Sequence, residues 1–179
     1  METRHFRRGC GIVAALLLFA VAALVSSAPA QAALKREVVA APGHYARGTI
    51  IIRTHERRLY LITRRGEAIR YPVAVGKPGK AWAGRTRIDG KYVNPAWAPP
   101  AAVKRDIPSI PNLIPGGAPN NPMGVRALTL AGDEYAIHGT NRPKTIGKAA
   151  SYGCIRMYNH DIVDLYERVR VGTPVIVEP

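Results

Sequence analysis

Two short stretches near the carboxyl end carry residues suited to nucleophilic chemistry. The first reads Ile137-His138-Gly139-Thr140, and the second, after a short loop, reads Ser151-Tyr152-Gly153-Cys154-Ile155-Arg156-Met157. A histidine therefore precedes a cysteine by sixteen positions. A thiol attacks as the thiolate, so its free pKa of about 8.5 is commonly lowered by a neighbouring imidazolium or a helix N-terminus. The pattern is typical of an activated cysteine.

The residues around the cysteine fit this chemistry. Gly153 leaves room for a substrate backbone and for a tight bend, whose N–H groups could point at a developing oxyanion. Arg156 lies two residues beyond the thiol and could hold a carboxylate through two parallel hydrogen bonds. Its alternative role is a structural ion pair with Asp161 or another acid. We expect Ser151 to hydrogen-bond the loop.

This pattern, His-Gly-Thr followed by Ser-x-Gly-Cys-Ile-Arg-Met, resembles the active-site signature of the L,D-transpeptidases of the YkuD (ErfK/YbiS/YcfS/YnhG) type, over roughly residues 49–177. The resemblance implies that Cys154 is acylated by a peptidoglycan stem peptide, that His138 is its base, and that the Gly139 carbonyl orients the imidazole. It implies no cofactor. The family usually has a histidine where this chain has Tyr152, which either donates its phenol to the oxyanion or shapes the pocket.

Residues 1–32 have the features of an export signal. Arg4, Arg7 and Arg8 form a positive segment, an apolar run extends from Cys10 to Val25, and residues 30–32 read Ala-Gln-Ala, a typical cleavage site. The run is shorter than the roughly twenty residues of a spanning helix. We expect a cleaved signal and a periplasmic or otherwise extracytoplasmic mature protein. The alternative is an uncleaved anchor.

Cleavage would remove Cys10 and leave Cys154 as the single cysteine in an oxidising compartment. Such a cysteine is either buried and inert or a reactive thiol. Because it stands among Gly, Ser and Arg, with His138 at the spacing of the family, the reactive alternative is favoured.

The chain is strongly basic, with a formal net charge of +14. Loss of residues 1–32 removes three arginines and one glutamate, which leaves 23 basic and 11 acidic residues. Export and the lack of an aromatic-interleaved basic motif argue against nucleic acid. An anionic wall or membrane surface is the more natural partner, and a generally basic surface without a specific partner is the alternative.

The hydrophobic pattern predicts a single, mainly β domain over residues 49–179, preceded by a short leader over 33–48. Strands are expected at 49–53, 58–62, 68–75, 125–130, 134–138 and 175–177, and Pro72 marks an edge or a bulge. Short strands are also expected at 86–88 and near Tyr92. The resemblance implies a β-sandwich of two mixed sheets with a few short helices.

Between residues 76 and 124 the chain is rich in glycine and proline yet contains apolar residues, so we expect ordered loops and a brief helix near 100–105. Core packing is favoured for Trp97, whereas Trp82 is either core or a platform for substrate. A further short helical turn is expected over 144–150. Asn159 is predicted to cap a helix whose last turn holds Arg168 and Arg170.

These features together predict an L,D-transpeptidase of the bacterial envelope. The acyl acceptor is left open among another stem peptide, which gives a 3–3 cross-link, an envelope protein, a D-amino acid and water, which makes the enzyme a carboxypeptidase. A non-catalytic, basic wall-binding module with an inert cysteine is the rival from another class. No Cys/His cluster or carboxylate set is spaced for a metal.

Overall fold

The computed structural model describes residue 1, residues 34–132 and residues 134–179. The expected signal segment, apart from Met1, lies outside these residues, as does Asp133 in the turn expected at 132–133. None of the helices in the described part of the chain has the length and apolarity needed to cross a bilayer.

Strands dominate the structure, as the runs of isoleucine, valine and tyrosine predict. Their bounds are β1 Glu37–Ala40, β2 Ile50–Arg53, β3 Arg58–Arg64, β4 Glu67–Gly76, β5 Gly84–Val93, β6 Arg126–Leu130, β7 Ala136–His138, β8 Ala149–Ser151, β9 Ile155–Met157 and β10 Pro174–Glu178. The helices are α1 Ala101–Asp106, the 3-10 turn η2 Pro143–Thr145 and α2 Asn159–Arg168. The predicted strands at 86–88 and near Tyr92 are one long strand, β5.

The strands pair in the order β4-β3-β2-β10-β5-β6-β7-β9, and β9 returns to pair with β4, so the sheet closes on itself. It is mixed, because β10 and β2, and also β7 and β9, run parallel. The resemblance implied a sandwich of two mixed sheets. The strands instead form one closed sheet, because β4 pairs with both β3 and β9, and β5 pairs with both β10 and β6. β4 changes partner at Pro72, which pairs with β3, whereas Val73 and Ala74 pair with β9.

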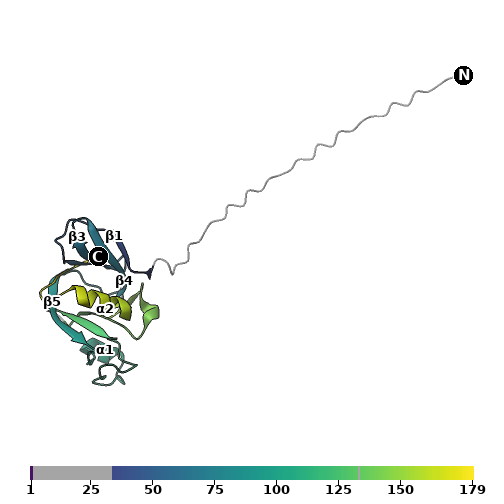
Figure 1. Cartoon of the computed structure of the whole chain (residues 1–179). Coiled ribbons are helices and arrows are strands. Elements are labelled where there is room, and N and C mark those ends of the chain that lie inside the picture. The colour runs from purple at the N-terminus through teal and green to yellow at the C-terminus, as the bar shows by residue number, and fades with distance from the viewer. Residues whose placement is uncertain (2–33, 133) are drawn as a thin grey trace.

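The core lies inside this closed sheet and under α2, which crosses the sheet over β6 and β7 (Figure 1). Ile162 and Leu165 on the inner face of α2 are fully buried against it. Tyr71 of β4 is also fully buried, and its hydroxyl donates to Asp164 at 2.6 Å. Burial of an aliphatic side chain such as Ile162 or Leu165 stabilises the fold by about 1.5–3 kcal/mol. The helix thereby fixes the position of β7.

Asn159 does not cap α2 as predicted. Tyr158 is the capping residue and makes no side-chain cap, and the helix ends at Arg168, before Arg170. The Asn159 side chain instead accepts a hydrogen bond from the backbone N–H of Thr140 at 3.0 Å. It therefore holds the segment that follows β7 against the start of α2.

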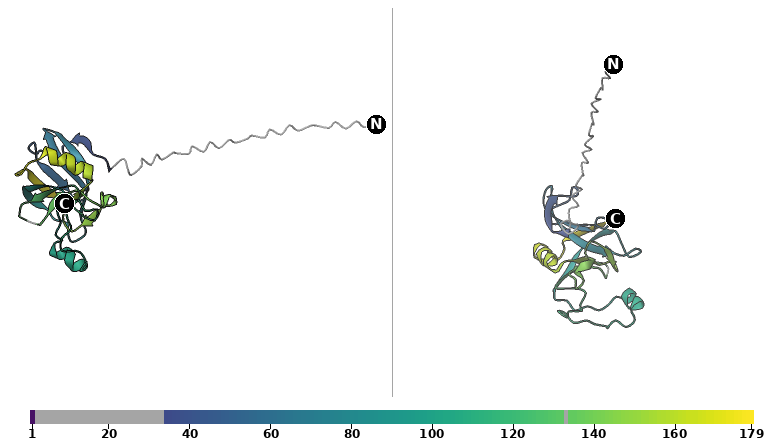
Figure 2. Two further views of the ribbon diagram at one scale, coloured as in Figure 1. Left: turned by 60° about the horizontal axis from the view of Figure 1, so that its bottom comes forward. Right: turned by 90° about the vertical axis from the view of Figure 1, so that its right-hand side faces the viewer.

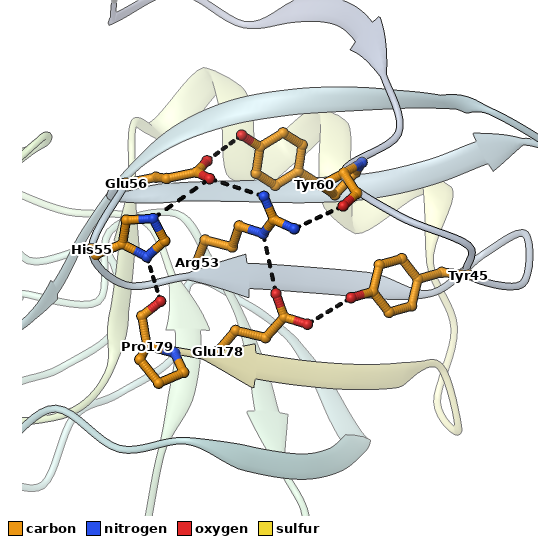
Figure 3. A network of polar contacts seen from close by, with 8 residues as sticks. Tyr45, Arg53, His55, Glu56, Tyr60, Glu178 and Pro179 are labelled. Atoms are coloured by element: carbon orange, nitrogen blue, oxygen red, sulfur yellow. Dashed lines mark hydrogen bonds and ion pairs between the residues drawn. The ribbon is translucent and has the colours of Figure 1, made fainter.

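The leader expected over residues 33–48 contributes a strand, because β1 pairs antiparallel with β4. A polar network continues this attachment (Figure 3). Arg53 of β2 donates to the carbonyl of Pro42 at 2.7 Å, to Glu56 at 3.0 Å and to Glu178 of β10 at 3.1 Å. Tyr45 donates to the same Glu178 at 2.6 Å. Leader, β2 and β10 are thus joined.

The glycine- and proline-rich segment between β5 and β6 is ordered and carries α1 at its far end. Figure 2 shows α1 projecting beyond the closed sheet on this long loop. The loop is held by a bridge between Trp97 and Ile114 and by the buried Asn121, whose amide donates to the carbonyls of Pro95 and Pro115 at 2.9 Å each. The turn expected over 144–150 is shorter than predicted, because residues 149–151 form β8.

Candidate active site

Two neighbouring strands bring the predicted cysteine and histidine to one face of the sheet. β7 ends at His138 and β9 begins just after Cys154, and the two strands are parallel, with Ile137 opposite Ile155 and His138 opposite Arg156. Side chains alternate between the two faces of a strand. Because Ile137 and Ile155 are buried in the core, His138, Cys154 and Arg156 share the opposite face.

His138 is rigidly mounted. Its side chain is buried, and Nδ1 donates to the Gly139 carbonyl at 2.7 Å. A carbonyl only accepts, so the neutral ring that makes this bond carries its proton on Nδ1 and its lone pair on Nε2. Burial, followed by the charge of Arg156, lowers the pKa of His138 to about 4. The imidazole is therefore neutral at physiological pH and is able to accept a proton.

Gly139 is a glycine because no side chain fits there. A Cβ would stand 2.2 Å from Oδ1 of Asn159, the atom that accepts from Thr140. The N–H of Gly139 donates to the backbone carbonyl of Arg126 in β6 at 3.0 Å. Its carbonyl is thus fixed as the acceptor for His138, the contact that the resemblance implied.

Cys154 is partly exposed, and its sulfur lies 4.0 Å from the carbonyl oxygen of Glu134. Burial raises the pKa of the thiol, against the lowering effects of the Ala136 backbone and of Arg156. The expected lowering of the thiol pKa is therefore not found, and the resting pair is a neutral thiol and a neutral imidazole. No hydrogen bond between the two side chains occurs among the described residues.

The loop before Cys154 is held by Ser151, as predicted. Ser151 Oγ donates to the Cys154 carbonyl at 2.6 Å and accepts from the N–H of Gly153 at 3.1 Å. Trp82 Nε1 donates to the Gly153 carbonyl at 3.0 Å, and its ring stacks on Tyr135 with centroids 5.0 Å apart. Gly153 adopts a φ of +122°, which favours glycine.

These contacts decide two open points. The N–H of Gly153 was expected to be available to an oxyanion. It is not free, because it already donates to Ser151 Oγ. Trp82 braces the loop and packs against the core. The contribution of Tyr135 was missed, because in the sequence it is marked only as a strand residue.

The phenol of Tyr152 is engaged elsewhere and is not available as an oxyanion donor. Its hydroxyl donates to Asp106 at the end of α1 at 2.6 Å, and Lys77 lies 3.9 Å from the centre of its ring. Lys77 also pairs with Asp106 at 3.2 Å. Tyr152 therefore ties the α1 loop to the cysteine loop.

Arg156 lines a pocket of about 340 Å³ beside the cysteine loop, together with Tyr152 and Trp97. It makes no ion pair with any acid that the structure describes. The acid first considered as its partner, Asp161, is buried and lies instead 3.8 Å from Arg36 and 3.5 Å from His160. Trp97, for which core packing was favoured, is half-buried at this pocket.

Within the described residues, no group of three or more His, Cys, Asp or Glu side chains is arranged to hold a metal ion.

Comparisons with known proteins agree with this geometry. The family model for the L,D-transpeptidase catalytic domain, YkuD, matches residues 47–177. The probable L,D-transpeptidase YbiS of Escherichia coli (strain K12) is 38% identical over 135 residues, which are 70% of this chain and 43% of that protein. Probable L,D-transpeptidase YcfS of the same strain is 35% identical over 136 residues, 70% and 42% of the two chains. The chain thus spans less than half the length of these curated relatives.

Solved structures show the same fold. An L,D-transpeptidase from Mycobacterium smegmatis superimposes with a TM-score of 0.56 at 17% identity, covering 73% of this chain and 58% of that one. A structure named as a probable carnitine operon oxidoreductase from Brucella melitensis is 41% identical, with a TM-score of 0.53 and coverage of 78% and 90%. Its name stands apart from the family model and the curated relatives, which agree with one another. The chain belongs to the YkuD family of L,D-transpeptidase catalytic domains.

Proposed function

We propose that this protein is a cysteine-dependent L,D-transpeptidase that acts on peptidoglycan stem peptides, with Cys154 as nucleophile and His138 as base. The observation that supports the proposal is the parallel pairing of β7 and β9, in which His138 stands opposite Arg156, two residues after Cys154. The hydrogen bond from His138 Nδ1 to Gly139 supports the assignment, because it leaves Nε2 free to take the thiol proton.

Acylation starts from the neutral pair. Sγ of Cys154 attacks the carbonyl carbon between the third residue of the stem, a diamino acid, and the terminal D-alanine. The thiol proton passes to Nε2 of His138 as the S–C bond forms, so no free thiolate is needed beforehand. When the tetrahedral intermediate collapses, the C–N bond breaks and His138 returns the proton to the departing amine. A thioester on Cys154 remains.

The second step reverses this sequence with a new amine. The acceptor attacks the thioester carbonyl, His138 takes the ammonium proton that is released, and the S–C bond breaks to regenerate the thiol. An acceptor stem peptide gives a 3–3 cross-link, an envelope protein becomes anchored to the wall, a D-amino acid gives exchange, and water gives L,D-carboxypeptidation.

Oxyanion stabilisation rests on the backbone in this proposal. Ser151 already accepts the N–H of Gly153, and Asp106 accepts the phenol of Tyr152. The N–H of Cys154 itself is therefore the proposed donor. Preorganised donors of this kind are worth roughly 3–4 kcal/mol in the transition state.

Peptidoglycan lies outside the cytoplasm, so the proposed activity requires export, and residues 1–32 have the sequence features of a signal that would provide it. The excess of basic residues suits an anionic envelope surface.

The test is to incubate purified protein with a disaccharide-tetrapeptide and to follow protein and products by mass spectrometry. The proposal expects release of D-alanine and an acyl adduct on Cys154. The His138→Gln variant should lose at least roughly a hundredfold in acylation rate. His44→Gln is the matched control, because His44 is exposed in the leader. Equal rates for the His138 variant and the control would refute the role of His138.

A further inference from the structure

Asn121 carries a buried amide that the proposed reaction does not use. The residue is 2% exposed and lies in the long loop between α1 and β6. Its Nδ2 donates to the carbonyls of Pro95 and Pro115 at 2.9 Å each, and its Oδ1 accepts the N–H of Met123 at 2.9 Å. Losing one of these bonds would leave a desolvated polar group, so the amide fixes the backbone around it. The donors tie the loop together, and the acceptor shapes the turn that follows.

The bond from Met123 to Asn121 closes a tight turn. An asparagine oxygen that accepts from the backbone N–H two residues ahead forms an Asx turn, which restricts the conformation of the residues it encloses. The enclosed residue is Pro122, whose ring already limits its φ. Gly124 follows with a φ of +65°, which favours glycine. The backbone carbonyls of this turn therefore have fixed directions.

The carbonyls of Pro122 and Met123 lie close enough to the imidazole of His138 to act on it. Together with the carbonyl of Gly139 they favour the charged form of the ring. The geometry of Gly139 gives independent evidence of this closeness, because a Cβ there would lie 3.2 Å from the carbonyl oxygen of Met123. Carbonyls from two separate segments thus surround one buried ring.

These carbonyls matter because the base becomes charged during acylation. Burial and the charge of Arg156 in β9 both disfavour the imidazolium of His138, whereas carbonyl dipoles stabilise it. The other charged groups of the neighbouring elements are engaged elsewhere. The guanidinium of Arg126 in β6 lies over an aromatic ring of α2, and Asp161 in α2 lies 3.8 Å from an arginine of the leader. Cys154 is the titratable group on the reacting side.

We propose that Asn121 is a positioning residue for the base. By closing its turn it holds the carbonyls of the next two residues against His138, where they stabilise the imidazolium formed as the thiol loses its proton. The inference rests on the proposed function, because it takes His138 as the base. The proton leaves Sγ of Cys154, is held by the imidazole, and returns to the departing amine. Asn121 neither takes nor gives a proton.

The direction of a pH shift separates this role from general support of the fold. Loss of the carbonyls would lower the pKa of His138 further below about 4, because carbonyl oxygens favour the charged ring. A loop that merely loosens admits water, which relieves desolvation and raises the pKa towards its ordinary value. The acid limb, where the acylation rate falls because the base is protonated, therefore moves down in the first case and up in the second.

The test measures the rate at which a carbapenem acylates Cys154 from about pH 3.5 to 7. Asn121→Ala removes both the donors and the acceptor. Its plateau rate should fall by roughly tenfold and its acid limb should move down by roughly one pH unit, since one unit of pKa corresponds to a factor of ten. Asn121→Ser lacks the amide donors but keeps an uncharged acceptor that closes the same kind of turn. Its rate should stay within about threefold of wild type, with an unmoved acid limb.

Ile51→Ala is the control for lost stability. Ile51 is fully buried in β2, in an apolar cluster separate from the main core. This variant should lower the melting temperature, as both Asn121 variants do, yet keep the plateau rate and the acid limb of wild type. Melting temperatures recorded at each pH ensure that the rates refer to folded protein. Should Asn121→Ala be unfolded, all rates are compared in trimethylamine N-oxide, which favours the folded state.

Two failures are distinguishable. If wild type forms no adduct on Cys154, or if His138→Gln is acylated at the wild-type rate, the proposed function itself fails. If acylation depends on His138 but Asn121→Ala keeps the wild-type rate, or its acid limb stays or moves up, the role of Asn121 is overturned. Equal losses in Asn121→Ser and Asn121→Ala would overturn it as well, because the turn would then not be what the base requires.

Discussion

Replacing Gly153 by alanine should damage both the cysteine loop and the reaction. A Cβ at this position would lie 2.3 Å from Cε1 of Tyr135, and the φ of +122° is one that alanine rarely adopts. Tyr135 has little freedom to retreat, because its ring is stacked on Trp82, and Trp82 donates to the Gly153 carbonyl. The substitution therefore acts on three coupled contacts.

The magnitude follows from these contacts. Positive φ in a residue other than glycine costs about 1–3 kcal/mol. Displacing Tyr135 from Trp82 loses up to roughly 0.5–1.5 kcal/mol of stacking, and weakening the hydrogen bond from Trp82 to Gly153 loses a similar amount. The free energy of unfolding should fall by about 2–6 kcal/mol, which lowers the melting temperature by on the order of 10 °C in a domain of this size. A shift of Cys154 by about 1 Å would cost about a hundredfold in acylation rate.

The assay is the rate at which a carbapenem acylates the thiol, followed by mass, together with thermal unfolding. Gly172→Ala is the matched control: Gly172 also has positive φ, at +88°, but a Cβ there would meet nothing within 4 Å. It should lose only about 1–2 kcal/mol and react at the wild-type rate. If the carbapenem acylated Gly153→Ala at the wild-type rate, the cysteine loop would not depend on this close contact.

Three further predictions follow from the site. Tyr152→Phe should change the acylation rate by less than about threefold, because the phenol is bound by Asp106; a hundredfold drop would restore Tyr152 as an oxyanion donor. Arg156→Lys should impair use of the tetrapeptide donor more than acylation by a small β-lactam, and equal losses would indicate a structural role. Because the pKa of the buried His138 is lowered to about 4, the unfolded state binds more protons than the folded state between pH 6.5 and 4. The free energy of unfolding should therefore fall by roughly 3 kcal/mol as the pH is lowered through that window. Urea unfolding of wild type and His138→Gln at pH 7 and pH 4.5 checks this, since the variant should lose less.

Local pattern predicted most strands, because runs such as Ile50–Arg53 are rich in β-branched residues and are bounded by turns. Local pattern could not predict which strands distant in the sequence pair with each other. The neighbourhood of β7 and β9, which brings His138 and Cys154 together, was implied only by the family signature. β1 was missed because its four residues lie within the turn-rich leader and their partner, β4, lies some thirty residues away.

Burial explains the remaining differences. Core packing was favoured for Trp97 and left open for Trp82, whereas in the structure Trp82 packs against the core and Trp97 lines the pocket. The pKa of the Cys154 thiol was expected to be lowered by a charged histidine. Instead desolvation acts on both groups, lowering the pKa of His138 and raising that of Cys154. Desolvation depends on the folded surroundings, which no local motif describes.

The role of Cys154 is tested by the mass of the intact protein after incubation with a disaccharide-tetrapeptide, compared between wild type and Cys154→Ala. For wild type we expect an increase equal to the donor minus D-alanine, mapped to Cys154. Cys154→Ala should show no increase and an almost unchanged melting temperature, because a partly exposed thiol contributes little packing. Turnover by Cys154→Ala, or an adduct that maps to another residue, would show that Cys154 is not the nucleophile.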